Sequence, residues 1–283
     1  MPNFMENWLK RKYDLIQEVE AVEELMNYQF HGINLFEKIA NDNFLCWEFR
    51  NNAITVSDFK EKSGIDEKCS EIYGEEPDNV DINLVMEYFE YAINLSIFVD
   101  KYAGNYVESK EIKTRCSAVA KNIDSIIKQC NYQMKMNSQN ALLLVVKDAI
   151  ADMACDIVGD SYNLNEDIFI YRHRSSDGNF VGKADILFRM GKYFEKEIKQ
   201  NMGGKAHLRQ LASNIGFLLN NLDLRHPPNQ KEEPIIKTLI ERKKLEKYYD
   251  ETYRQIVSII VLFDCAEKQI EIDELKSMIS LGE

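Results

Sequence analysis

The feature that most constrains the fold is the stretch of residues 181–200, VGKADILFRMGKYFEKEIKQ. Its alternating apolar and polar residues predict two short β-strands, because successive side chains of a strand point to opposite faces. A three-residue turn at 190–192, which contains glycine, would join the strands into a hairpin. The apolar face of the first strand would consist of Ala184, Ile186 and Phe188.

This hairpin register brings two carboxylates together on the opposite face. With a turn at 190–192, Asp185 lies directly across from Glu197, and Cβ atoms of such pairs are about 4.5–5.5 Å apart. Lys199 follows two residues later on the same face. Opposed like charges are destabilising unless a group such as a divalent cation compensates for them. The set therefore predicts metal-assisted phosphodiester hydrolysis, with the metal activating a water molecule that Lys199 positions.

Asp185, eleven intervening residues and then Glu197-Ile198-Lys199 resemble the signature of the PD-(D/E)xK nuclease superfamily, with Ala184 in place of the signature's proline. The resemblance implies that Asp185 and Glu197 bind Mg²⁺ or Mn²⁺, and that the Ile198 carbonyl is a third ligand. It also implies that Lys199 is catalytic.

The resemblance assigns supporting roles to residues on flanking helices. Members of the superfamily often draw a further acid from the helix that precedes the strands, which we expect at residues 138–158. Asp152 and Asp148 are the two alternatives there, although the usual residue is Glu. A helix at 205–222 would place Gln210 near the site, as family members often place a glutamine.

The order of expected elements fits the same fold. Strands at 167–172 and 181–200 follow the first helix, and the helix at 205–222 precedes an apolar run at 255–263 that is typical of a strand buried on both faces. Residues 269–272 would add a short edge strand. We therefore expect an α/β fold in which a helical N-terminal region, 1–136, precedes a restriction-endonuclease-like αβββαβ core with a mixed sheet, 137–283.

Local charge favours a nucleic-acid partner despite a net charge of -12. Residues 171–209 contain nine Lys or Arg and four acids, and phosphate binding requires only a local basic patch. DNA is the expected substrate, although the sequence does not separate it from RNA. The residues expected to contact nucleic acid are Arg172, Arg174, Lys183, Lys205 and Arg209.

The N-terminal half carries two opposite charge patterns. Residues 51–100 contain twelve acids and three lysines, which suits solvent or a basic protein partner. Residues 101–135 reverse this balance, with seven basic residues against three acids. Ordinary solvated helix faces are the favoured explanation of both patterns.

Composition predicts a cytoplasmic protein. No apolar run approaches the roughly 20 residues of a membrane span, so we expect no membrane association. The six cysteines are scattered without a CxxC pair, which argues against a zinc site and a disulfide framework and favours a reducing compartment.

The sequence therefore predicts a metal-dependent DNA endonuclease. The resemblance to stand-alone nucleases of this superfamily suggests a role in restriction or phage defence. A homodimer is also expected, because many such enzymes cut both strands as dimers. The alternative is a catalytically inactive nucleic-acid-binding protein on the same fold, or a regulatory protein whose acidic half docks onto a partner.

Overall fold

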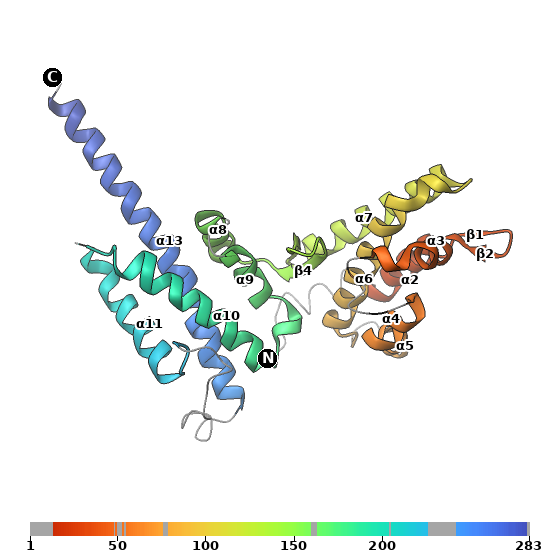
Figure 1. Cartoon of the computed structure of the whole chain (residues 1–283), viewed down its shortest axis with the longest axis horizontal. Coiled ribbons are helices and arrows are strands. Elements are labelled where there is room, and N and C mark those ends of the chain that lie inside the picture. The colour runs from red at the N-terminus through yellow and green to blue at the C-terminus, as the bar shows by residue number, and fades with distance from the viewer. Residues whose placement is uncertain are drawn as a thin grey trace. The chain divides into compact units, whose positions relative to one another are not determined.

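The structure is a computed structural model, and it describes residues 14–47, 49, 53, 55–75, 79–159, 163–203, 205–225 and 242–281. These residues are mostly helical (Figure 1). The chain divides into two compact units, unit 1 (Met1–Val146) and unit 2 (Lys147–Glu283). The division lies ten residues beyond the expected boundary at 136. Each unit has its own hydrophobic core.

The described residues of unit 1 form helices and two small hairpins. Their elements are α2 (Leu15–Met26), β1 (Gln29–Phe30), β2 (Ile33–Asn34), α3 (Leu35–Asn43), η1 (Phe44–Cys46), α4 (Val56–Ser63), α5 (Ile65–Gly74), α6 (Ile82–Tyr102), η3 (Ala103–Asn105), α7 (Ser109–Gln129), β3 (Tyr132–Met136) and β4 (Leu142–Val146).

Helix α6 lies at the centre of unit 1 and packs against α2, α3, α5 and α7. Asp81 begins it as an N-cap, because its carboxylate accepts the Asn83 N–H at 2.9 Å. Around Trp47, which is buried, a cluster of aromatic rings includes Phe59 and Phe98. Helix α6 lies within the helical N-terminal region expected at 1–136.

Two buried side chains of α6 hold the β3–β4 hairpin. The side chain of Asn94 accepts the Leu142 N–H at 2.9 Å and donates to the Leu142 carbonyl at 2.8 Å. The Glu90 carboxylate accepts the Leu144 N–H at 2.8 Å. These bonds satisfy the edge of β4 that β3 leaves unpaired, so the two-stranded sheet has a covered edge.

The described residues of unit 2 are mostly helical. Its described elements are α8 (Ala149–Val158), α9 (Leu164–Tyr171), η5 (Arg174–Ser176), α10 (Phe180–Tyr193), the π-helical segment η6 (Phe194–Lys199), η7 (Ala206–Leu208), α11 (Arg209–Asn221) and α13 (Arg242–Leu281). Helix α13 packs against α8, α10 and α11 and supplies the centre of the core, including Ile256 and Ile260.

The expected α/β fold with a restriction-endonuclease-like αβββαβ core is wrong. The described residues form only two two-stranded sheets, and both lie in unit 1. The stretch expected to form the central hairpin, 181–200, is instead the α10–η6 helix. Its buried residues recur with helical spacing at Ala184, Leu187, Gly191 and Phe194.

Gly191, expected in the turn of the hairpin, is instead a packing residue within α10. A Cβ atom at this position would lie 2.9 Å from the side chain of Leu219 on α11, and Leu219 is itself buried. The glycine therefore allows α10 and α11 to approach closely and does not interrupt the helix.

The remaining expected strands are helices too. Residues 167–172 lie largely in α9, and residues 255–263 and 269–272 lie in α13. A short apolar run such as 255–263 fits a buried helix as well as a strand, because helices surround it on several sides. The helix expected at 138–158 divides into strand β4 and helix α8, whereas the helix expected at 205–222 is confirmed as η7 and α11. No helix among the described residues is long and apolar enough to cross a membrane.

Candidate functional site

The structure separates the predicted catalytic residues along one helical stretch. Asp185 lies on α10, and Glu197 and Lys199 lie on η6. Twelve residues of helix place Asp185 and Glu197 roughly 18 Å apart along the axis. Two carboxylates at this separation cannot ligate one ion, and no cluster of three or more His, Cys, Asp or Glu in the described part of the chain could hold a metal.

Asp185 contributes to an ion-pair cluster between α9 and α10. Its carboxylate accepts a hydrogen bond from Arg189 one turn later, and Arg189 also binds the buried carboxylate of Asp167 at 2.5 Å. The hydrogen bonds that Arg189 donates to Asp167, and then to Asp185, hold the pKa of its guanidinium above its usual range. Burial raises the pKa of Asp167, although Arg189 opposes this effect. The cluster ties two helices together.

The residues of η6 face different surroundings. Lys199 is exposed, and Glu197 lies 3.5 Å from Lys196. Ile198 is buried, and its carbonyl accepts the Asn201 N–H at 3.1 Å, so the atom expected to bind a metal already has a backbone partner. Phosphodiester hydrolysis stays a prediction that rests on the sequence motif.

The expected supporting residues have local structural roles. Asp148 is the N-cap of α8 and accepts the Ile150 N–H at 3.0 Å. Asp152 accepts a hydrogen bond from Arg172 at 2.9 Å. Gln210 donates to Asn214 on the exposed side of α11 at 3.0 Å.

Most of the basic residues expected to contact nucleic acid are engaged within unit 2. Arg172 binds Asp152 with a side chain only 6% exposed, and Lys183 is 4% exposed. Lys205 pairs with Glu267 and lies over the Phe263 ring. Arg174 is partly buried on η5, and Arg209 is exposed at the start of α11.

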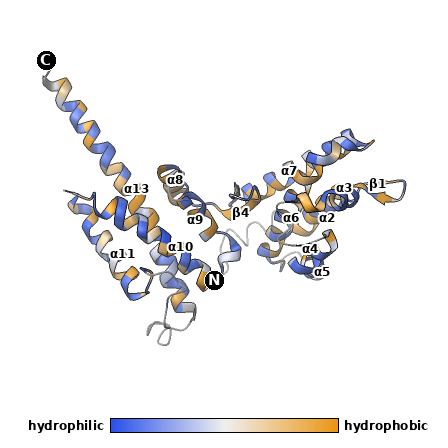
Figure 2. Ribbon diagram, in the orientation of Figure 1, coloured by the Kyte–Doolittle hydropathy of each residue, from blue (hydrophilic) through white to orange (hydrophobic). Residues whose placement is uncertain are grey.

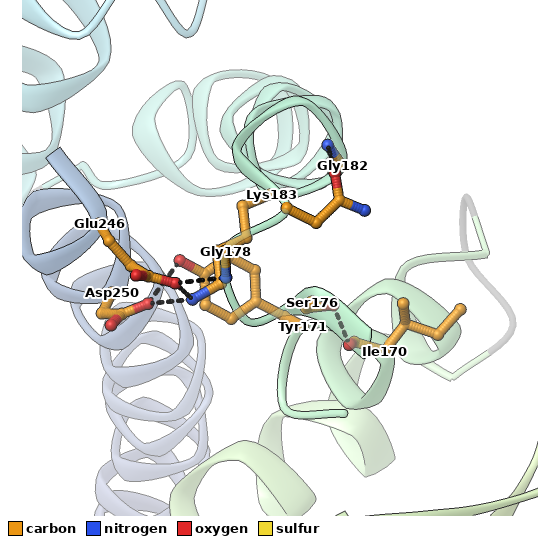
Figure 3. A network of polar contacts seen from close by, with 9 residues as sticks. Ile170, Tyr171, Ser176, Gly178, Gly182, Lys183, Glu246 and Asp250 are labelled. Carbon is orange, nitrogen blue, oxygen red and sulfur yellow. Dashed lines mark hydrogen bonds and ion pairs between the residues drawn. The ribbon is translucent and has the colours of Figure 1, made fainter. Parts of the chain in front are cut away.

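Lys183 is the centre of the polar network in Figure 3. Its ammonium lies 2.9 Å from Glu246 Oε1 and 2.9 Å from Asp250 Oδ1, both on α13. The Tyr171 hydroxyl donates to the same Asp250 oxygen at 2.9 Å, and the Gly178 N–H donates to Glu246 at 3.0 Å. The network therefore joins α9, the turn before α10, α10 and α13.

The pKa values of Lys183 and Glu246 are shifted in the directions that favour their charged forms. Burial alone would lower the pKa of Lys183, but hydrogen bonds with Asp250 and Glu246 outweigh burial and raise it. The Gly178 N–H and then Lys183 lower the pKa of Glu246. An open hollow of about 350 Å³ adjoins the network. Because Lys183 is buried and fully paired, the cluster is a structural anchor of unit 2.

The exposed face of α7 in unit 1 is a different kind of charged surface. Lys110, Lys113 and Lys121 are exposed along it, and within the described chain none of them makes an ion pair. Thr114 and Ser117 lie between them. The five side chains, with Ala118, line an open hollow of about 490 Å³. We call these five residues the lysine face.

The other face of α7 explains how this surface is presented. Ile112, Val119 and Ile123 are buried at helical spacing, and α7 packs against α2 and α6. Arg115 and Lys128 are occupied by Glu111 and Asp124 one turn away. Three lysines are thus left to solvent over roughly 16 Å of helix. The recurrence of Lys, Thr and Ser at positions 110, 113, 114, 117 and 121 is the sequence signal for this face.

Comparisons with family models, with curated proteins and with solved structures found no match to this chain. Of the two charged sites, the Lys183 network is internally neutralised and the lysine face is not, so the lysine face is the candidate functional site.

Proposed function

We propose that this protein binds nucleic acid by placing the lysine face of α7 against the phosphate backbone. The observation that supports this most directly is the row of Lys110, Lys113 and Lys121, exposed and without acidic partners among the described residues. Lysines bound to phosphates release condensed counterions, which supplies affinity without sequence reading. Hydroxyl groups such as that of Ser117 are suited to donate to phosphate oxygens between the lysines.

The composition of this face favours nucleic acid over an acidic protein. Stable protein interfaces bury an apolar centre that often includes aromatic residues, surrounded by a polar rim. Among the described residues that line the hollow, Ala118 is the only apolar one. A surface of lysines and hydroxyls offers contacts to phosphates and no apolar anchor for a protein partner.

The same composition favours a duplex over a single strand. Proteins that bind single strands stack bases on aromatic side chains in addition to contacting phosphates. None of the described residues that line the α7 hollow is aromatic. We therefore propose a phosphate-contacting duplex binder that does not read sequence, with a dissociation constant of about 10⁻⁴ to 10⁻⁶ M at physiological salt. The cytoplasm is the proposed location, and the six free cysteines support it.

Replacing two lysines should abolish most of the binding. We expect Lys113→Ala with Lys121→Ala to weaken duplex binding roughly 50- to 200-fold at about 50 mM salt, because two of three phosphate contacts are lost. Fluorescence anisotropy of a labelled duplex measures this. Lys128→Ala is the matched control on the same helix. Because Lys128 is already paired with Asp124, its replacement should change the affinity for the duplex less than about threefold.

Equal weakening by Lys128→Ala, or no weakening by the double variant, would contradict the proposal. The same proteins incubated with supercoiled plasmid and Mn²⁺ test the hydrolytic prediction separately. If the wild type cuts the plasmid and Glu197→Ala does not, the protein is also a nuclease. If the wild type binds the duplex without cutting it, the protein is a non-catalytic binding protein.

A further inference from the structure

The C-terminal part of α13 is an exposed amphipathic helix. Every side chain from Glu267 to Ile279 is exposed, although this segment continues the same helix that forms the core of unit 2 (Figure 1). Ile272, Leu275 and Ile279 are between 47% and 61% exposed. Figure 2 shows hydrophobic residues continuing along this part of α13. Large apolar side chains gathered on one exposed helix indicate an interaction surface.

These apolar residues follow the spacing of a coiled coil. Residues 265, 268, 272, 275 and 279 are separated by alternating steps of three and four, which is the a/d repeat of heptads. Ile272 and Ile279 occupy a positions and Leu275 occupies a d position. This choice, β-branched residues at a and leucine at d, favours two parallel strands.

We propose that the 265–279 segment of α13 pairs with the same segment of a second copy of this chain as a parallel two-stranded coiled coil. Charge complementarity supports a second copy of the same segment as the partner helix. Glu271 falls at a g position and Lys276 at the following e position, and these positions face each other across a parallel dimer. Each Glu271 therefore meets the Lys276 of the other copy.

The antiparallel arrangement lacks this complementarity. It would bring g positions against g positions, so that Glu271 would face Asp264 or Glu271 of the other copy. Lys268, at the remaining d position, interrupts the apolar seam. Polar residues inside a seam specify register at some loss of stability, and Lys268 has Asp264 at 2.7 Å as a partner on its own helix.

Crosslinking through Cys265 tests the parallel, in-register pairing directly. This cysteine is exposed and occupies an a position, so a parallel in-register dimer places the two Cys265 side chains opposite each other. Residues facing each other at this position suit the roughly 4.4–6.8 Å Cα separation of a disulfide. Mild oxidation of the full chain should therefore produce a disulfide-linked dimer. Cys265→Ser should abolish the crosslink and Cys46→Ser should leave it intact, although Cys46 is also exposed.

Sedimentation equilibrium of the full chain tests the seam. We expect a dimer whose dissociation constant rises at least about 100-fold in Ile272→Asp, because an apolar contact is lost in both copies. Ile270→Asp is the matched control. Ile270 is 47% exposed, as is Ile272, but lies outside the seam, and its replacement should leave the dissociation constant unchanged within about threefold.

Exchanging the charges of Glu271 and Lys276 tests whether the partner helix is a second copy of the same segment. Glu271→Lys alone should weaken the dimer about tenfold, and adding Lys276→Glu should restore it, because the pairs then re-form with reversed sign. A chain that stays monomeric, a dimer that tolerates Ile272→Asp, or crosslinking that does not require Cys265 would each overturn the proposal. Failure of nucleic-acid binding would leave it untouched, because α7 belongs to unit 1.

Discussion

Lys183→Met is expected to lower the free energy of unfolding of unit 2 by about 3 kcal/mol. The substitution removes the cation that Glu246 and Asp250 share, and removing one partner of a buried ion pair costs about 3–5 kcal/mol. The two carboxylates are partly exposed, so the lower end of that range applies. Urea-induced unfolding followed by circular dichroism measures the change.

Tryptophan fluorescence reports on unit 1 and so separates its unfolding from that of unit 2. Trp8 and Trp47 are the only two in the chain and both belong to unit 1, so their fluorescence should show an unchanged transition in Lys183→Met. Lys192→Met is the control, because Lys192 is exposed on the same helix and should alter stability by no more than about 0.5 kcal/mol. Equal loss of stability in the two variants would show that the Lys183 network does not anchor unit 2.

At acidic pH, the difference in the free energy of unfolding between the wild type and Lys183→Met should become smaller. A carboxylate whose pKa is lowered on folding stabilises the fold above its unfolded pKa, and this contribution is lost as pH falls through the folded value. The pKa of Glu246 is lowered from 4.5, so the difference should be complete above pH 4.5 and shrink below it.

Asn94→Ala is expected to lower the free energy of unfolding of unit 1 by about 2–3 kcal/mol. Asn94 is 5% exposed and bonds both the N–H and the carbonyl of Leu142. Alanine would leave these backbone groups without their partner, and each unsatisfied buried group costs about 1–3 kcal/mol. Tryptophan fluorescence during urea unfolding reports on this unit.

Asn105→Ala provides the comparison for this substitution. Asn105 is exposed in η3, so its replacement should change stability by no more than about 0.5 kcal/mol. The Asn94 account fails if Asn94→Ala unfolds at the same urea concentration as the wild type.

Features determined by local chemistry could be predicted from the sequence. Helix α6 follows from its apolar content, and α11 follows from its apolar stripe after glycines 203 and 204. The reversal of charge at residues 101–135 also appears in the sequence, and α7 with its lysine face lies within it.

Features determined by tertiary contacts could not be predicted. Alternation at 181–200 fits a hairpin and a helix, and only contact with Leu219 identifies Gly191 as a packing residue. Asn94 and Glu90 hold β4 from more than 45 positions away, so the strand inside the expected 138–158 helix has no local signal.

The candidate site shows the same limit. Counting charges at 171–209 gives a basic patch, but the count does not show that Asp152 neutralises Arg172 or that two carboxylates neutralise Lys183. Pairing across helices determines which cations remain available. At α7 the spacing places Glu111 one turn from Arg115, but Asp124 lies one turn from both Lys121 and Lys128, and only the structure shows that it pairs with Lys128.

The salt dependence of duplex binding tests the central claim most directly. Each phosphate contact contributes about −0.9 to the slope of log K against log salt concentration, so three lysines predict a slope of about −2.7. Lys113→Ala with Lys121→Ala should reduce it to about −0.9, and Lys128→Ala should leave it unchanged. A wild-type slope near zero, or one that the double variant retains, would contradict the proposal that the lysine face of α7 binds nucleic-acid phosphates.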